Sequence, residues 1–129
     1  MPQDRNLRVL VVDDQESMRL LTRACLRRLD IESVVEARTG QEAIGELEKQ
    51  KFDLVISDWI MPDMDGLQLL TYVREQPTLK ATPFIMTSAR QLDDEISIAL
   101  RAGADKYLVK PFKAEALGGC IDALVGPRV

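Results

Sequence analysis

The fold is decided by a short apolar run that ends in two acids, Leu7-Arg8-Val9-Leu10-Val11-Val12-Asp13-Asp14. The apolar part, residues 7–12, is rich in β-branched side chains and too short for a helix, which indicates a buried strand. Strands of this kind are typical of a parallel sheet with helices on both faces. The run therefore predicts such a sheet, whose first strand delivers two carboxylates to its carboxyl end.

Short apolar runs continue to alternate with longer amphipathic segments along the rest of the chain. Further strands are predicted over residues 33–37, 53–57, 83–87 and 106–109. Apolar side chains recur at helical spacing in five segments, which predicts helices over residues 16–29, 41–49, 67–75, 91–102 and 113–125. Strands alternating with helices predict one α/β domain over residues 1–129, with no linker, repeat or attached output domain.

Local signals place several helix ends. Thr39 is the expected N-cap of the second helix, with Glu42 three residues on. Gly103 is expected to end the fourth helix in a left-handed conformation. Gly118 and Gly119 weaken the last helix by about 1 kcal/mol each relative to alanine, so its middle is the least certain helical segment.

Composition excludes several classes of protein. A net charge of −4 argues against a general nucleic-acid binder, and no apolar stretch is long enough to span a membrane. The amino terminus lacks the pattern of a secretory signal, so we expect the chain in the cytoplasm, with Cys25 and Cys120 as buried, reduced thiols. We also expect the chain to be a monomer. The chain has no histidine, which excludes serine–histidine and cysteine–histidine catalysis and makes most zinc sites unattainable.

Chemically active side chains follow the predicted strands. Their positions are Asp13 and Asp14 after the first strand, Asp58 after the third, Ser88 after the fourth and Lys110 after the fifth. Ligands of an open parallel sheet bind beyond the carboxyl ends of its strands, so these groups are expected to converge there. Crowded carboxylates repel one another unless a cation neutralises them, and a hard divalent ion such as Mg2+ suits oxygen ligands.

Each of these residues also has a simpler interpretation. Asp13 with Glu16 fits a capping box, Asp58 fits a turn in an acidic loop, and Lys110 fits a solvated strand end. A flavin- or nucleotide-binding protein is disfavoured, because the acidic loop at residues 13–14 would repel phosphate until a cation is bound.

The pattern resembles the receiver domains of two-component response regulators, and among them the CheY-type chemotaxis receivers. The resemblance covers nearly the whole chain, in the family's order and spacing. It is carried by Val11-Val12-Asp13-Asp14, Val55-Ile56-Ser57-Asp58-Trp59, Met61-Pro62-Asp63-Met64-Asp65-Gly66-Leu67, Ser88-Ala89, Ala102-Gly103-Ala104 and Tyr107-Leu108-Val109-Lys110-Pro111-Phe112.

The resemblance implies a flavodoxin-like, five-stranded sheet in the order 2-1-3-4-5 and a set of roles at its edge. Asp58 would accept a phosphoryl group from the histidine of a sensor kinase. Asp14 and Asp58 would bind Mg2+ directly, with the backbone carbonyl of Ile60, whereas Asp13 would act through water. Lys110 would stabilise the transferred group, and the Lys110–Pro111 bond would be cis.

Two residues are implied to report phosphorylation. Ser88 would turn to a phosphoryl oxygen, and Tyr107 would follow it inward and change the surface of the fourth helix, fifth strand and fifth helix. Thr87 competes for the hydroxyl role, but strand alternation lets only one of Thr87 and Ser88 face the site, and Ala89 favours Ser88. Tyr107 as an ordinary strand aromatic is the simpler alternative.

Other positions distinguish this chain from the chemotaxis receivers. Ile60 stands where they carry a polar residue, and Arg90 stands where they carry an acid, so slow loss of phosphate is predicted. A stripe of Arg19, Arg23 and Arg27 is interpreted as a solvated helix face, or alternatively as a docking surface for an acidic kinase or phosphotransfer domain.

The sequence therefore predicts a signalling switch rather than an enzyme. Its output would be a separate protein, such as the flagellar motor switch, and it would bind neither nucleic acid nor membrane. The first alternative is a phosphorelay shuttle to a histidine phosphotransfer protein. A Mg2+-dependent phosphatase is a weaker one, because Ile60 stands where such an enzyme needs a second acid.

Overall fold

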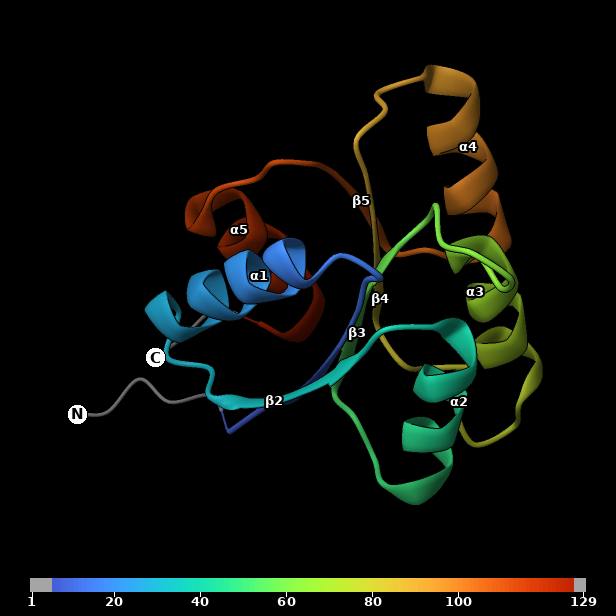
Figure 1. The fold of residues 1–129 in the computed structure, drawn as a ribbon, viewed down its shortest axis with the longest axis horizontal. Helices are drawn as coiled ribbons and strands as arrows, with labels where there is room; N and C mark the ends of the chain where they lie inside the picture. The colour runs from blue at the N-terminus through green and yellow to red at the C-terminus, as the bar shows by residue number, and fades with distance from the viewer. Residues whose placement is uncertain (1–5, 127–129) are drawn as a thin grey trace.

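The computed structural model describes residues 6–126, in which a central sheet lies between two layers of helices (Figure 1). The strands are β1 (Arg8–Val12), β2 (Ser33–Ala37), β3 (Leu54–Asp58), β4 (Phe84–Ser88) and β5 (Lys106–Val109). Neighbouring strands are parallel, in the order β2-β1-β3-β4-β5, which confirms the predicted doubly wound sheet.

Helices cover both faces of this sheet. They are α1 (Glu16–Arg28), α2 (Gly40–Lys49), α3 (Gly66–Glu75), α4 (Asp93–Ala102) and α5 (Ala114–Val125). Figure 1 shows α1 and α5 on one face and α2, α3 and α4 on the other. No helix within residues 6–126 has the length and apolar content needed to cross a membrane.

Strand alternation divides the apolar side chains of β1 between two cores. Val9 and Val11 pack with residues of α1 and α5, whereas Leu10 and Val12 pack with residues of α2 and α3. All four side chains are at most 2% exposed, so β1 is buried on both faces as its sequence predicts. The strand lies inside the sheet, between β2 and β3.

Two strands lie one residue further along the chain than predicted. Asp53 stays outside β3, where its carboxylate accepts the N–H of Arg8, and Pro83 stays outside β4 because it has no N–H for the ladder. At the other end, β3 includes Asp58 and β4 includes Ser88. The strand ladder therefore holds both site residues, which the sequence had placed just beyond it.

Several helix ends agree with the sequence. The hydroxyl of Thr39 accepts the N–H of Glu42 at 3.0 Å, and Gly103 ends α4 with a φ of 115°. Helix α4 begins at Asp93, two residues later than predicted. The capping box between Asp65 and Gln68 at the start of α3 was missed, although an acid followed three residues later by glutamine is readable from sequence.

Helix α5 is continuous through its two glycines. Gly118 is buried, and a Cβ there would lie 3.0 Å from Cδ2 of Leu29, so the glycine lets the helix pack closely beside α1. The cysteines are free: Cys25 is buried as predicted, whereas Cys120 is only half-buried. Burial raises the pKa of both thiols above the ordinary value.

Candidate functional site

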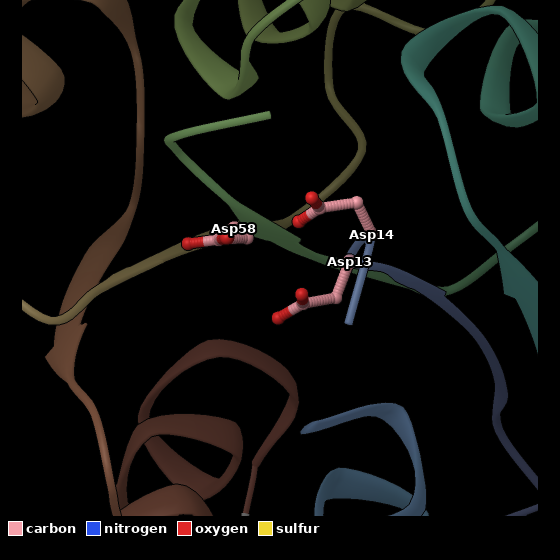
Figure 2. Close-up of side chains that lie close together, drawn as sticks. All are labelled: Asp13, Asp14 and Asp58. Atoms are coloured by element: carbon pink, nitrogen blue, oxygen red, sulfur yellow. The ribbon is translucent and has the colours of Figure 1, made fainter. Parts of the chain in front are cut away.

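The predicted site residues meet at the carboxyl edge of the sheet. Asp13 and Asp14 follow β1, Asp58 ends β3, Ser88 ends β4 and Lys110 follows β5. Figure 2 shows the side chains of Asp13, Asp14 and Asp58 close together, with those of Asp13 and Asp14 extending towards the side of Asp58. One carboxylate oxygen from each lies within 4.8 Å of the others.

The three carboxylates differ in exposure. Asp13 is 4% exposed and Asp58 is 5% exposed, whereas Asp14 is exposed. The cluster is therefore closed from below by the sheet and open to solvent on the side of Asp14. Asp14 and Asp58 both line a cavity on this side.

The capping interpretation of Asp13 is wrong. The N-cap of α1 is Gln15, which makes no side-chain cap hydrogen bond. Oδ1 of Asp13 instead accepts the N–H of Gln15 at 2.9 Å, in the short turn before the helix. The Asp13 carboxylate is thus turned towards the cluster and not along the axis of α1.

Lys110 is the cation of the site. Its Nζ lies 3.2 Å from Oδ2 of Asp13 and 3.3 Å from Oδ1 of Asp58, and its side chain is 10% exposed. The backbone N–H of Lys110 donates to the carbonyl of Ser88 at 2.8 Å, which ties it to the end of β4. The Lys110–Pro111 bond is cis, as predicted.

One ammonium does not balance three carboxylates. Burial raises the pKa of Asp58 above its ordinary value, the charge of Asp13 raises it further, and Lys110 opposes both effects. The excess negative charge and the all-oxygen donor set fit a hard divalent cation such as Mg2+. Receiver domains hold Mg2+ in an acidic pocket of this kind, and the cluster of Asp13, Asp14 and Asp58 matches it.

A cavity of about 420 Å³ opens directly above the cluster. Its lining consists of Asp14, Gln15, Asp58, Ile60, Ser88, Ala89, Arg90 and Lys110. Ile60 is 56% exposed, and the guanidinium of Arg90 pairs with Glu95 at 3.2 Å. Ile60 and Arg90, the two positions at which a departure from chemotaxis receivers was expected, thus border the same cavity as Asp58.

Ser88, and not Thr87, borders this cavity. The hydroxyl of Ser88 accepts the N–H of Arg90 at 3.1 Å, and the carbonyl of Arg90 accepts the hydroxyl of Tyr107 at 2.8 Å. The ring of Tyr107 meets Trp59 edge-on, with centroids 6.3 Å apart. A short chain of contacts therefore runs from Ser88 to Tyr107 and on to Trp59, the neighbour of Asp58.

The arginine stripe of α1 is not a uniform solvated face. Arg27 is exposed, but the side chain of Arg19 is only 9% exposed and binds Glu36. Arg23 binds the same carboxylate at 2.9 Å. The contact between Arg19 and Glu36 was not predicted, because Glu36 lies on β2 and helical periodicity gives no sign of it.

Comparison with known proteins agrees with this geometry. Residues 9–122 match the response regulator receiver domain family. The chain is 37% identical to chemotaxis protein CheY-3 of Vibrio cholerae over 121 residues, which cover 94% of this chain and 93% of that protein. It is 39% identical to chemotaxis protein CheY of Pseudomonas aeruginosa over 111 residues, covering 86% and 90% of the two chains.

A solved structure shows the same fold. Chemotaxis protein CheY4 of Vibrio cholerae superposes with a TM-score of 0.85 at 34% identity, over 92% of this chain and 98% of that one. The family is one of signalling proteins and not a family of enzymes with separate substrates. The chain belongs to the response regulator receiver domain family, and is a CheY-like receiver of two-component signalling.

Proposed function

We propose that the protein is a switch activated by phosphorylation of Asp58. A carboxylate oxygen of Asp58 attacks the phosphorus of a phosphohistidine on a sensor kinase. The P–N bond breaks, the imidazole leaves and takes up a proton, and Asp58 becomes an acyl phosphate. The observation that carries this proposal is the buried Asp58 carboxylate, which faces two further acids and lies 3.3 Å from Nζ of Lys110.

Asp13, Asp14 and Asp58 are proposed to hold the Mg2+ required for this transfer. Asp14 and Asp58 would hold it directly, together with the backbone carbonyl of Ile60, and Asp13 would act through water. Bound Mg2+ supplies charge neutralisation at the transferred oxygens. The oxygen donors and the excess negative charge of the cluster support this assignment.

Lys110 stabilises the transferred group in this proposal. Its ammonium already lies between Asp13 and Asp58. When Asp58 carries a phosphoryl group, the ammonium pairs with a phosphoryl oxygen. The backbone of Lys110 stays bound to the end of β4. Phosphoryl transfer depends mainly on such positioning and charge stabilisation, so no histidine of this chain is needed.

Ser88 and Tyr107 carry the signal outwards. If the Ser88 hydroxyl turns to a phosphoryl oxygen, it loses the hydrogen bond that it accepts from the N–H of Arg90. The carbonyl of the same residue holds the Tyr107 hydroxyl, so a shift of this loop moves Tyr107 against Trp59. The change then reaches the surface formed by α4, β5 and α5.

The α4 side of that surface supports a protein partner. Leu92, Ile98 and Leu100 lie at or on α4 and are between 46% and 50% exposed. Because relatives of this chain are chemotaxis proteins, we propose a target such as the flagellar motor switch. The alternative is a phosphorelay shuttle, which rapid transfer of phosphate from Asp58 to a second histidine protein would reveal.

Ile60 and Arg90 are proposed to slow the hydrolysis of the acyl phosphate. Both border the cavity, and the Ile60 side chain offers no group that orients water. We also propose that the chain is a monomer, forms a single domain and acts in the cytoplasm, which stay predictions.

The test of the proposed function is direct phosphorylation. The protein is incubated with a small acyl-phosphate donor, with and without Mg2+, and its intact mass is recorded beside that of Asp58→Asn. We expect one phosphoryl adduct that needs both Mg2+ and Asp58. Trp59, the only tryptophan of the chain, gives a parallel fluorescence signal. An adduct that persists in Asp58→Asn would contradict the assignment of the phosphoacceptor.

A further inference from the structure

We propose that Arg19 is a positioning residue for the acidic cluster, which it serves by holding the peptide unit between Asp13 and Asp14. The inference rests on the proposed function, because it concerns the same metal-binding carboxylates. Arg19 lies on α1 and does not itself belong to the cluster.

The first observation is the burial of Arg19 and the identity of its partners. An arginine is almost never buried without partners for its N–H groups. Here Nε donates to Oε1 of Glu36 at 2.9 Å, and Nη1 donates to the backbone carbonyl of Asp13 at 2.7 Å. Arg19 thus connects α1 to β2 and to the residue that follows β1.

The second observation is that the polar groups of Asp13 are held from several directions. Its N–H donates to the carbonyl of Ala37 at 3.1 Å. Its carboxylate accepts from Gln15 at 2.9 Å and from Lys110 at 3.2 Å. The carbonyl is held by Arg19, and this carbonyl shares one planar peptide unit with the N–H of Asp14. The hydrogen bond from Arg19 therefore sets the direction in which the chain enters Asp14.

Asp14 depends on this backbone more than its neighbours do. Within residues 6–126 its carboxylate makes no hydrogen bond or ion pair, whereas Asp13 and Asp58 both contact Lys110. The Asp14 side chain is exposed, so packing does not fix it either. Its place in the cluster is consequently set by its backbone. Partners of this kind, one step away from the metal ligands, change metal affinity by about 10- to 100-fold.

The charge of Arg19 and its hydrogen-bond geometry predict opposite changes in Mg2+ affinity when the side chain is removed. A guanidinium near the cluster repels a divalent cation, so removing it would strengthen Mg2+ binding if charge dominated. Glu36 reduces this repulsion, because it pairs with both Arg19 and Arg23 at 2.9 Å. The directional hydrogen bond to the Asp13 carbonyl is then the larger contribution, and its loss weakens binding.

The experiment titrates MgCl2 at constant ionic strength into the full chain and follows Trp59 fluorescence. Arg19→Lys keeps the charge but loses the two-pronged donor geometry, and Arg19→Gln loses both. We expect both variants to bind Mg2+ about tenfold more weakly than wild type. Arg23→Gln is the matched control: it removes a contact with Glu36 but none with Asp13, so its Mg2+ affinity should stay that of wild type.

Two further readouts separate positioning from a merely structural role. Urea denaturation gives the stability of each variant, and the amide signal of Asp14 in a ¹H–¹⁵N spectrum reports the peptide that Arg19 holds. We expect that signal to shift in both Arg19 variants and not in Arg23→Gln. If the Arg19 variants do not fold, Glu36→Asp keeps the charge but shortens the side chain that binds Nε of Arg19, and weaker Mg2+ binding than in wild type is expected.

The possible outcomes are distinct. Wild-type affinity in Arg19→Lys together with tighter binding in Arg19→Gln would overturn the inference in favour of simple repulsion. Lower stability with unchanged Mg2+ affinity, or unchanged affinity in Glu36→Asp where that variant is needed, would overturn it in favour of a structural role. A wild-type chain that binds no Mg2+ would contradict the proposed function itself and the inference with it.

Discussion

Aspartates at the two edges of the sheet meet opposite surroundings. At the amino edge, Asp53 accepts the N–H of Arg8 at 2.8 Å and Asp105 accepts the N–H of Phe84 at 2.9 Å. Each of these carboxylates thus satisfies the first residue of a strand. At the carboxyl edge, the carboxylates of the acidic cluster lie close to one another instead (Figure 2). At the amino edge, the carboxylates accept hydrogen bonds from strand ends. At the carboxyl edge, they concentrate negative charge that a bound cation can neutralise.

Each edge also contains an arginine that holds backbone carbonyls. Arg74 donates to the carbonyls of Gly103, Lys80 and Thr82 and pairs with Asp105 at 3.1 Å. Arg19 uses the same kind of contact at the carboxyl edge, but the carbonyl that it holds belongs to the acidic cluster. The contact is of the same kind at both edges, but only the contact at the carboxyl edge involves a residue of the candidate metal cluster.

The largest expected effect is the loss of the arginine at the amino edge. Arg74→Met keeps much of the aliphatic stem but removes the arginine donor of three carbonyls and leaves Asp105 with only the N–H of Phe84. We expect the free energy of unfolding to fall by about 2–4 kcal/mol in urea denaturation. Mg2+ affinity should not change, since no candidate ligand is touched.

The matched control for Arg74→Met is Arg27→Met, at an exposed arginine. This substitution should change stability by less than about 0.5 kcal/mol. A cost below about 1 kcal/mol for Arg74→Met, or a change in its Mg2+ affinity, would break the division between the two edges.

A smaller effect of opposite sign is expected for Asp58→Asn without Mg2+. Burial and Asp13 raise the pKa of Asp58, so its ionised form destabilises the fold at neutral pH. Asparagine removes this charge, and the variant should be more stable than wild type at pH 7.

The difference between Asp58→Asn and wild type depends on pH. As the pH falls through the raised pKa of Asp58, folded wild type takes up a proton before the unfolded chain does. Wild type thereby regains the stability that the ionised Asp58 had cost it. Urea denaturation at a series of pH values should therefore show an advantage of the variant that shrinks towards acid pH. Addition of Mg2+ should favour wild type. An advantage that does not change with pH would contradict the electrostatic origin.

The smallest effect is expected at an exposed position of the carboxyl edge. Ile60→Asn places a water-orienting amide at the mouth of the cavity without changing the carboxylates. We expect the acyl phosphate to be lost about fivefold faster, which corresponds to about 1 kcal/mol in the barrier. Decay of the phosphoryl adduct by intact mass measures this rate. Equal decay rates in variant and wild type would contradict the proposal that Ile60 slows hydrolysis of the acyl phosphate.

Much of the site could be read from the sequence because it lies at the ends of local patterns. The apolar runs predict the strands, and parallel strands bring their carboxyl ends to one edge, so Asp13, Asp58 and Lys110 were expected at the same edge of the sheet. The missed capping box at Asp65 was equally local and could have been predicted. Strand order was available only from the resemblance to receivers, because periodicity does not specify which strands are neighbours.

The sequence alone determined the elements, their alternation and the residue types that follow each strand, because these depend on side-chain period and turn chemistry. Only the tertiary structure decided which polar groups pair. Arg19 and Arg27 occupy equivalent positions in a helical stripe, yet one is buried and the other exposed. The difference comes from Glu36, which β2 brings to Arg19 from seventeen residues away along the chain. A buried cation is stable only where packing supplies such partners, and no local pattern encodes that condition.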